Sequence, residues 1–256
     1  MKFALVNNER QEAQPSLEGR CLGCGSPMLA RCGEVRIKHW AHKGTRRCDP
    51  WWENETEWHR NWKNQFPSNW QEIVQYAENG EKHIADLKTE EGWVLEFQHS
   101  YIKPEERRSR EEFYQKLIWV VDGTRRVSDK KRFFDILGDS SFNKNYPGLK
   151  STFPEGALLR DWIESKTHVF FDFGGEDLWW LLSDSNEYWA FVLPLPRSKF
   201  IEIHNSNPAE FDELIKTYAV TPPKFTPSKH PWVESRDIHP NELLMALRNQ
   251  RRYRRK

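Results

Sequence analysis

The sequence predicts a mixed α/β protein that begins with a small cysteine-rich module. Between residues 53 and 121 the spacing of apolar residues predicts the order helix, three strands, helix, strand. All four cysteines precede this stretch and lie between residues 21 and 48. We therefore expect an N-terminal module at residues 1–49, an α/β core at 50–127 and an α+β extension at 128–256.

The composition is that of a polar, folded protein of 256 residues with 30% charged residues. The formal net charge is only +1, which excludes a strong overall field that would attract nucleic acid. No apolar stretch approaches the roughly 20 residues that cross a bilayer, so we expect no membrane association. The N-terminus becomes polar after Val6, unlike a signal peptide, and we expect a cytoplasmic protein.

The first core helix is predicted at residues 53–66, which lack Pro and Gly. Trp58, Trp62 and Phe66 recur at every fourth position and share one face. Asn79 and Gly80 form a turn dipeptide between two strand patterns. The remaining core elements are strands at 70–76, 82–87 and 93–98, a helix from Pro104 to about residue 116, and a buried strand at 117–121.

The extension contains two strand-like aromatic runs, at residues 167–173 and 188–193. Its other predicted features are a loop at 140–148, helices near 208–218 and 239–250, and a Pro-rich linker at 221–231. Residues 246–256 carry six basic side chains and no acidic one. Such a tail either contacts phosphate or is simply solvated, and the sequence does not decide between the two.

Acidic side chains on the second and third core strands predict a site for Mg²⁺ or Mn²⁺. Glu96 and Gln98 lie two residues apart and share one strand face, while Asp86 lies near the end of the neighbouring strand. Asp86 and Glu96 could therefore bind one hard cation through oxygen, with Gln98 orienting water or phosphate. The alternative is that they are ordinary polar strand residues.

The two core helices add further candidate residues. Glu55, His59 and Lys63 recur at every fourth position, so Glu55 could support the cation while His59 and Lys63 contact water or phosphate. Arg107 and Arg110 on the second helix are candidates for contact with a nucleic-acid backbone. In both helices the alternative is a solvated face whose charges form salt bridges.

The N-terminal module carries a predicted zinc site. Cys21 and Cys24 have the two-residue spacing with which paired thiolates bind one tetrahedral ion. We predict His42 and Cys48 as the other ligands and a closed, structural zinc site. His39 is the first substitute, Cys32 is interpreted as a small buried residue, and an all-cysteine site stays open.

The combined motifs resemble the competence protein CoiA-like family over about residues 20–125. They are CxxCGSPM, HWAHKG, CDPWWENETEWHRNWK, EKHIADL, WVLEFQHSYIKPEER and LIWVVDG. That family is placed in the PD-(D/E)XK nuclease superfamily, so the resemblance implies a restriction-endonuclease-like core and a metal-dependent nuclease. By the resemblance, Glu55, His59, Lys63, Asp86 and Glu96 match motif residues. Gln98 stands where the superfamily often has lysine.

The resulting prediction is hydrolysis of phosphodiester bonds in DNA, including single-stranded DNA, with RNA as a weaker option. The resemblance connects this activity with DNA uptake and recombination, and recombination or defence proteins are candidate partners. The alternative is a DNA-binding or scaffold protein without catalytic activity. The sequence does not indicate an oligomeric state.

Overall fold

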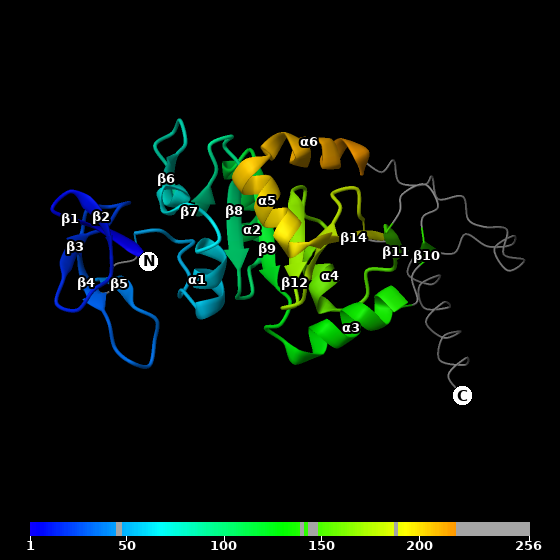
Figure 1. The fold of residues 1–256 in the computed structure, drawn as a ribbon, viewed down its shortest axis with the longest axis horizontal. Helices are drawn as coiled ribbons and strands as arrows, with labels where there is room; N and C mark the ends of the chain where they lie inside the picture. Colours follow the sequence, from blue (N-terminus) through cyan, green and yellow to red (C-terminus); the bar gives the residue numbers. More distant parts are fainter. Residues whose placement is uncertain (45–47, 139–140, 143–147, 187–188, 219–256) are drawn as a thin grey trace, which may run out of the picture. The chain divides into compact units, whose positions relative to one another are not determined.

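Two β-sheets and the helices that pack on them make up a mixed α/β fold in a computed structural model of the chain (Figure 1). The structure describes residues 1–44, 48–138, 141–142, 148–186 and 189–218. The predicted linker at 221–231, the helix at 239–250 and the basic tail lie outside these residues, as does most of the loop predicted at 140–148.

The smaller sheet is antiparallel and forms the N-terminal module. Its strand order is β2-β1-β3-β4-β5. The side chains of Ala4, Met28 and Trp40 fill its core, together with Cys21. The strands are β1 (Phe3–Val6), β2 (Glu9–Glu12), β3 (Glu18–Arg20), β4 (Pro27–Arg31) and β5 (His39–His42).

The larger sheet has nine strands in the order β10-β11-β14-β13-β12-β9-β8-β7-β6 among the described residues. Strands β8, β9 and β12 are parallel neighbours, and the other pairs are antiparallel. The bounds are β6 (Gln71–Tyr76), β7 (Lys82–Lys88), β8 (Val94–Gln98), β9 (Leu117–Asp122), β10 (Ser141–Phe142), β11 (Lys150–Thr152), β12 (His168–Asp172), β13 (Asp177–Leu181) and β14 (Ala190–Pro196). One sheet thus continues across the boundary predicted at residue 127.

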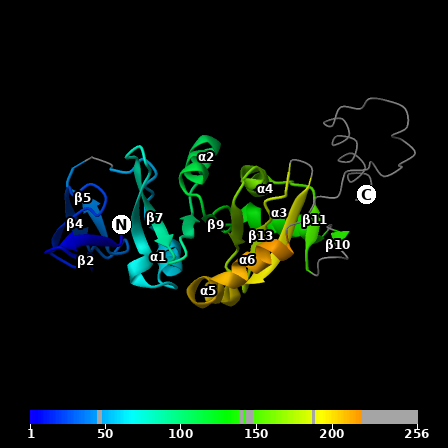
Figure 2. The ribbon, with the colours of Figure 1, turned by 90° about the horizontal axis from the view of Figure 1, so that it is seen from above.

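Helices cover both faces of this sheet (Figure 2). Helices α1, α5 and α6 pack on one face through Trp62, Phe200 and Phe211, and α3 and α4 pack on the other through Phe133 and Trp162. The bounds are α1 (Glu57–Lys63), α2 (Pro104–Phe113), α3 (Val127–Gly138), α4 (Ala157–Trp162), α5 (Arg197–Ser206) and α6 (Pro208–Thr217). None of the helices in the described ranges combines the length and apolar character needed to cross a bilayer.

The predicted order of helix, three strands, helix and strand is confirmed by α1, β6, β7, β8, α2 and β9. The first helix begins later than predicted because Thr56 caps it: the Thr56 side chain accepts a hydrogen bond from the backbone N–H of His59. The prediction that Glu55 lies on this helix is therefore wrong, since α1 begins at Glu57. Strand β13 and helix α5 were not predicted.

Asp172, at the end of β12, links α1 to the C-terminal half of the sheet. Its Oδ2 accepts hydrogen bonds of 2.9 Å from the indole Nε1 of both Trp58 and Trp62. Its Oδ1 accepts a bond from the backbone N–H of Gly174 and another from the Arg197 side chain. The Asp172 carboxylate is buried, and removing it would leave these four donors without their shared acceptor.

We expect the Asp172→Asn substitution to lower the free energy of unfolding by about 3 kcal/mol. An amide has one acceptor oxygen and would place N–H donors against other donors. Urea denaturation measures the change, with Asp177→Asn as the control because Asp177 is only half-buried and begins the next strand. Equal losses in the two variants would contradict a special role for Asp172.

Candidate functional site

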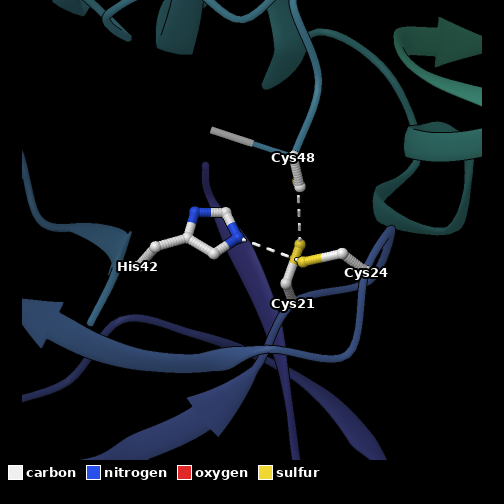
Figure 3. Close-up of side chains that lie close together, drawn as sticks. All are labelled: Cys21, Cys24, His42 and Cys48. Atoms are coloured by element: carbon white, nitrogen blue, oxygen red, sulfur yellow. Dashed lines mark hydrogen bonds between the residues drawn. The ribbon is translucent and has the colours of Figure 1, made fainter. Parts of the chain in front are cut away.

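Four side chains of the N-terminal module converge on one point (Figure 3). Cys21 and Cys24 come from the loop between β3 and β4, His42 ends β5, and Cys48 follows in the chain. Their ligand atoms all lie within 4.8 Å of one another. Cys21 Sγ is 3.5 Å from Cys48 Sγ, and Cys24 Sγ is 3.4 Å from His42 Nε2. This group is the ligand set predicted from the sequence.

The geometry and chemistry of these residues fit a metal ion such as zinc. Zinc–thiolate bonds of about 2.3 Å in a tetrahedron place ligand atoms roughly 3.8 Å apart, close to the separations here. Burial acts to raise the pKa of Cys24, but hydrogen bonds from Ser26 and His42 outweigh it and lower that pKa to about 6. Neither Cys32 nor His39 belongs to the group, and His39 Nδ1 instead lies 2.8 Å from the carbonyl oxygen of Ile37.

Asp86 and Glu96 meet where β7 and β8 separate. The antiparallel pairing of these strands includes Leu87 with Leu95 and Lys88 with Val94. One residue further on, side chains replace the backbone partners: Asp86 donates its N–H to Glu96 Oε1 at 3.2 Å, and Phe97 donates its N–H to Asp86 Oδ2 at 3.0 Å. The two carboxylates therefore lie beside each other between diverging strands.

Glu96 is buried and lies beside the guanidinium group of Arg110. Burial, followed by the nearby Asp86 carboxylate, raises the pKa of Glu96 to about 8, while Arg110 acts in the opposite direction. Arg110 Nη1 donates to Glu96 Oε2 at 3.1 Å. Arg110 is itself buried and also donates to the backbone carbonyl of Trp51 at 2.8 Å. At pH 7 the Glu96 carboxyl group is therefore mainly protonated, and a bound cation would displace that proton.

A second charged cluster lies beside Asp86. Lys63 Nζ is 2.8 Å from Glu55, 3.0 Å from Glu72 and 3.9 Å from Asp86. Burial alone would lower the pKa of Lys63, but Glu72 and Glu55 outweigh it and raise that pKa, so the ammonium group stays charged. Burial lowers the pKa of His59, whose Nε2 is 3.9 Å from Asp86. His59 is therefore neutral at pH 7.

Gln98 points toward the segment that precedes α1. Its side-chain amide donates to Glu53 and to the backbone carbonyl of Ser100. A cavity of about 280 Å³ connects this region with the cysteine cluster. Its lining includes His42, Cys48, Asp49, Trp51, Trp52, Glu53, Glu55, His59, Lys63, Glu72, Asp86, Glu96, Gln98 and Arg110.

Three cations predicted to contact nucleic acid are buried in this structure. Lys63, Arg107 and Arg110 expose only 2%, 2% and 4% of their surface. Arg107 pairs with Glu111 at 2.9 Å instead of facing solvent. Their burial does not support direct contact with a phosphate backbone, because each cation already has a carboxylate partner inside the fold.

Acidic residues of the cavity wall that were not predicted as site residues include Glu72 and Asp49. Glu72 adopts a left-handed backbone with φ of 49° at the start of β6, a conformation that costs non-glycine residues about 1–3 kcal/mol. Its carboxylate accepts the backbone N–H groups of Lys2 and Phe3, which ties the N-terminal module to the core. Asp49, adjacent to Cys48, was the more detectable of the two because it follows a predicted ligand directly.

Comparison of the chain with models of protein families, with curated proteins and with solved structures finds no match.

Proposed function

We propose that the chain is a metal-dependent nuclease that hydrolyses phosphodiester bonds in DNA, with a restriction-endonuclease-like core similar to that of the CoiA-like family. The observation that carries this proposal is the meeting of Asp86 and Glu96 between diverging strands, inside a cavity. Two carboxylates with room for water and phosphate oxygens form the ligand set that Mg²⁺ or Mn²⁺ prefers.

A cation held by Asp86 and Glu96 would polarise the phosphodiester and lower the pKa of a bound water. Arg110 keeps the Glu96 carboxylate in place through its bond of 3.1 Å. His59 is neutral and 3.9 Å from Asp86, so it can accept a proton from a water beside that carboxylate.

Lys63 places a positive charge beside Asp86 without contacting the phosphate itself, since its ammonium group pairs with Glu55 and Glu72. Gln98 occupies the place on β8 where the resemblance leads one to expect lysine, and an amide cannot stabilise a developing negative charge as strongly. Lys63 reaches the same region from α1, with Nζ 3.9 Å from Asp86. Because its pKa is raised, Lys63 remains a cation and does not act as a base.

Incubation of the full chain with DNA tests this function. Labelled single-stranded and double-stranded DNA are mixed with protein and Mg²⁺, Mn²⁺ or a chelator, and the products are separated on denaturing gels. We expect strand cleavage with either cation and none with the chelator. DNA binding without cleavage under all conditions would contradict the proposal and favour a scaffold role.

Binding of Mn²⁺ at this site should strengthen as the pH rises. Because the pKa of Glu96 is raised to about 8, the cation competes with a proton below that pH. For a single proton, the affinity is expected to increase about 50-fold between pH 6 and pH 8. Calorimetric titration at several pH values measures it, and the Glu96→Gln variant should show weak binding without this dependence. A flat profile in the wild type would contradict the assignment of Glu96 as a ligand.

A further inference from the structure

The chain between Cys48 and α1 runs along the wall of the cavity. We call residues 49–55 the connecting segment; it contains one turn but no helix or strand. It starts directly after a ligand of the cysteine cluster and ends just before Thr56, the N-cap of α1. Without regular hydrogen bonding of its own, its position depends on contacts made by its side chains and carbonyl groups.

Asp49 attaches the start of the connecting segment to β7. Its Oδ1 accepts the backbone N–H of Trp51 and bonds His83 Nδ1, both at 2.9 Å. Its Oδ2 accepts the backbone N–H of Ile84 at 2.9 Å. The indole ring of Trp51 stacks on the His83 imidazole with centroids 3.2 Å apart. Asp49 is buried, so these contacts fix its orientation next to Cys48.

The rest of the connecting segment contacts the partners of the carboxylate site. The carbonyl oxygen of Trp51 accepts from Arg110, whose other nitrogen holds Glu96. Glu53 accepts from the Gln98 amide, and Glu55 pairs with Lys63 at 2.8 Å. The connecting segment therefore contacts Arg110, which bonds Glu96, and Lys63, which lies beside Asp86. It also contacts Gln98 directly.

We propose that metal binding by Cys21, Cys24, His42 and Cys48 fixes the connecting segment and thereby strengthens divalent-cation binding by Asp86 and Glu96. Asp49 is the positioning residue that transmits the effect, because it joins a ligand of the first centre to β7, which carries Asp86. The inference rests on the proposed function in that it assumes a cation between Asp86 and Glu96. As a coupling between two binding sites it is reciprocal: Mn²⁺ at the carboxylates strengthens zinc binding by the same factor.

The test measures Mn²⁺ affinity in the full chain without any activity assay. Free Mn²⁺ is quantified by electron paramagnetic resonance for zinc-loaded wild type, zinc-stripped wild type and zinc-loaded Asp49→Asn. The Asp86→Asn variant assigns the binding to the carboxylates. Glu18→Gln is the matched control, since it removes an acid of the same module whose partner Lys43 is at the surface.

Stripping zinc and Asp49→Asn should each weaken Mn²⁺ binding about tenfold or more, as changes around a metal ligand commonly do. Glu18→Gln should leave it unchanged, and Asp49→Asn should still hold zinc. His83→Gln, which spares the two backbone partners of Asp49, should act in the same direction with a smaller effect.

Equal Mn²⁺ affinity with and without zinc, and in Asp49→Asn, would overturn the coupling while leaving the carboxylate site intact. Loss of zinc from Asp49→Asn would overturn the role of Asp49, because that residue would then belong to the cysteine centre itself. Absence of Mn²⁺ binding in the zinc-loaded wild type would overturn this inference together with the proposed nuclease site.

Discussion

Replacing Asp86 with asparagine is expected to reduce metal-dependent DNA cleavage by about a thousandfold, equivalent to roughly 4 kcal/mol of transition-state stabilisation. Asparagine keeps the shape of the side chain and its acceptor for the Phe97 N–H, but it lacks the charge that holds a cation. We therefore expect the thermal unfolding temperature to change little. Single-turnover cleavage of labelled DNA with Mn²⁺ measures the loss.

Asp135→Asn is the matched control for this experiment, since Asp135 pairs with Lys131 on the exposed side of α3. It should cleave DNA like the wild type. If Asp86→Asn retained full cleavage while binding Mn²⁺ as tightly as the wild type, hydrolysis at Asp86 and Glu96 would have to be rejected.

Removal of a cysteine ligand should have the largest effect on stability. In Cys48→Ser the cluster loses one thiolate and the tetrahedral shell is incomplete, so we expect zinc to be lost and the small sheet to unfold at a lower temperature. Structural zinc contributes about 10–16 kcal/mol of apparent binding free energy in small zinc-finger peptides. Losing even part of that free energy would strongly lower the stability of the small sheet. Zinc content by mass spectrometry of the native protein and calorimetric unfolding measure both effects.

Cys32→Ser separates zinc binding from the general cost of replacing a cysteine. Cys32 lies just after β4, outside the ligand group, and we expect its variant to hold zinc with the stoichiometry of the wild type. Zinc loss in Cys32→Ser with retention in Cys48→Ser would show that the ligand set is wrong.

Local sequence patterns were sufficient to predict the order of the core elements and the residues of the cysteine cluster. Apolar spacing predicted α1, the three following strands, α2 and β9 because each of these elements buries a regularly spaced set of side chains. The cluster was predictable because Cys21 and Cys24 share a short loop, and because few other soft ligands exist in the module. Strand β13 was not predicted, although four of its five residues are apolar.

The carboxylate site was predicted in its residues but not in its environment. Glu96 and Gln98 were chosen from strand alternation and Asp86 from its place near the end of the neighbouring strand. The divergence of β7 and β8 that brings Asp86 and Glu96 together has no sequence signature. The burial of Lys63 and its pairing with Glu72 likewise depend on β6 lying beside α1. Glu72 carried no signal at all, since its left-handed backbone and its bonds to the N-terminal strand are tertiary features.

By itself the sequence determined the order of the core elements from α1 to β9, and which four side chains can bind a soft metal, because these properties depend on spacing over a few residues. Only the tertiary structure decided that the connecting segment lies between the cysteine cluster and the carboxylates, and that Lys63 and Arg110 are buried beside them. Such contacts join residues that are far apart in the chain. The protonation states of these side chains follow from burial and neighbouring charge, which no local pattern contains.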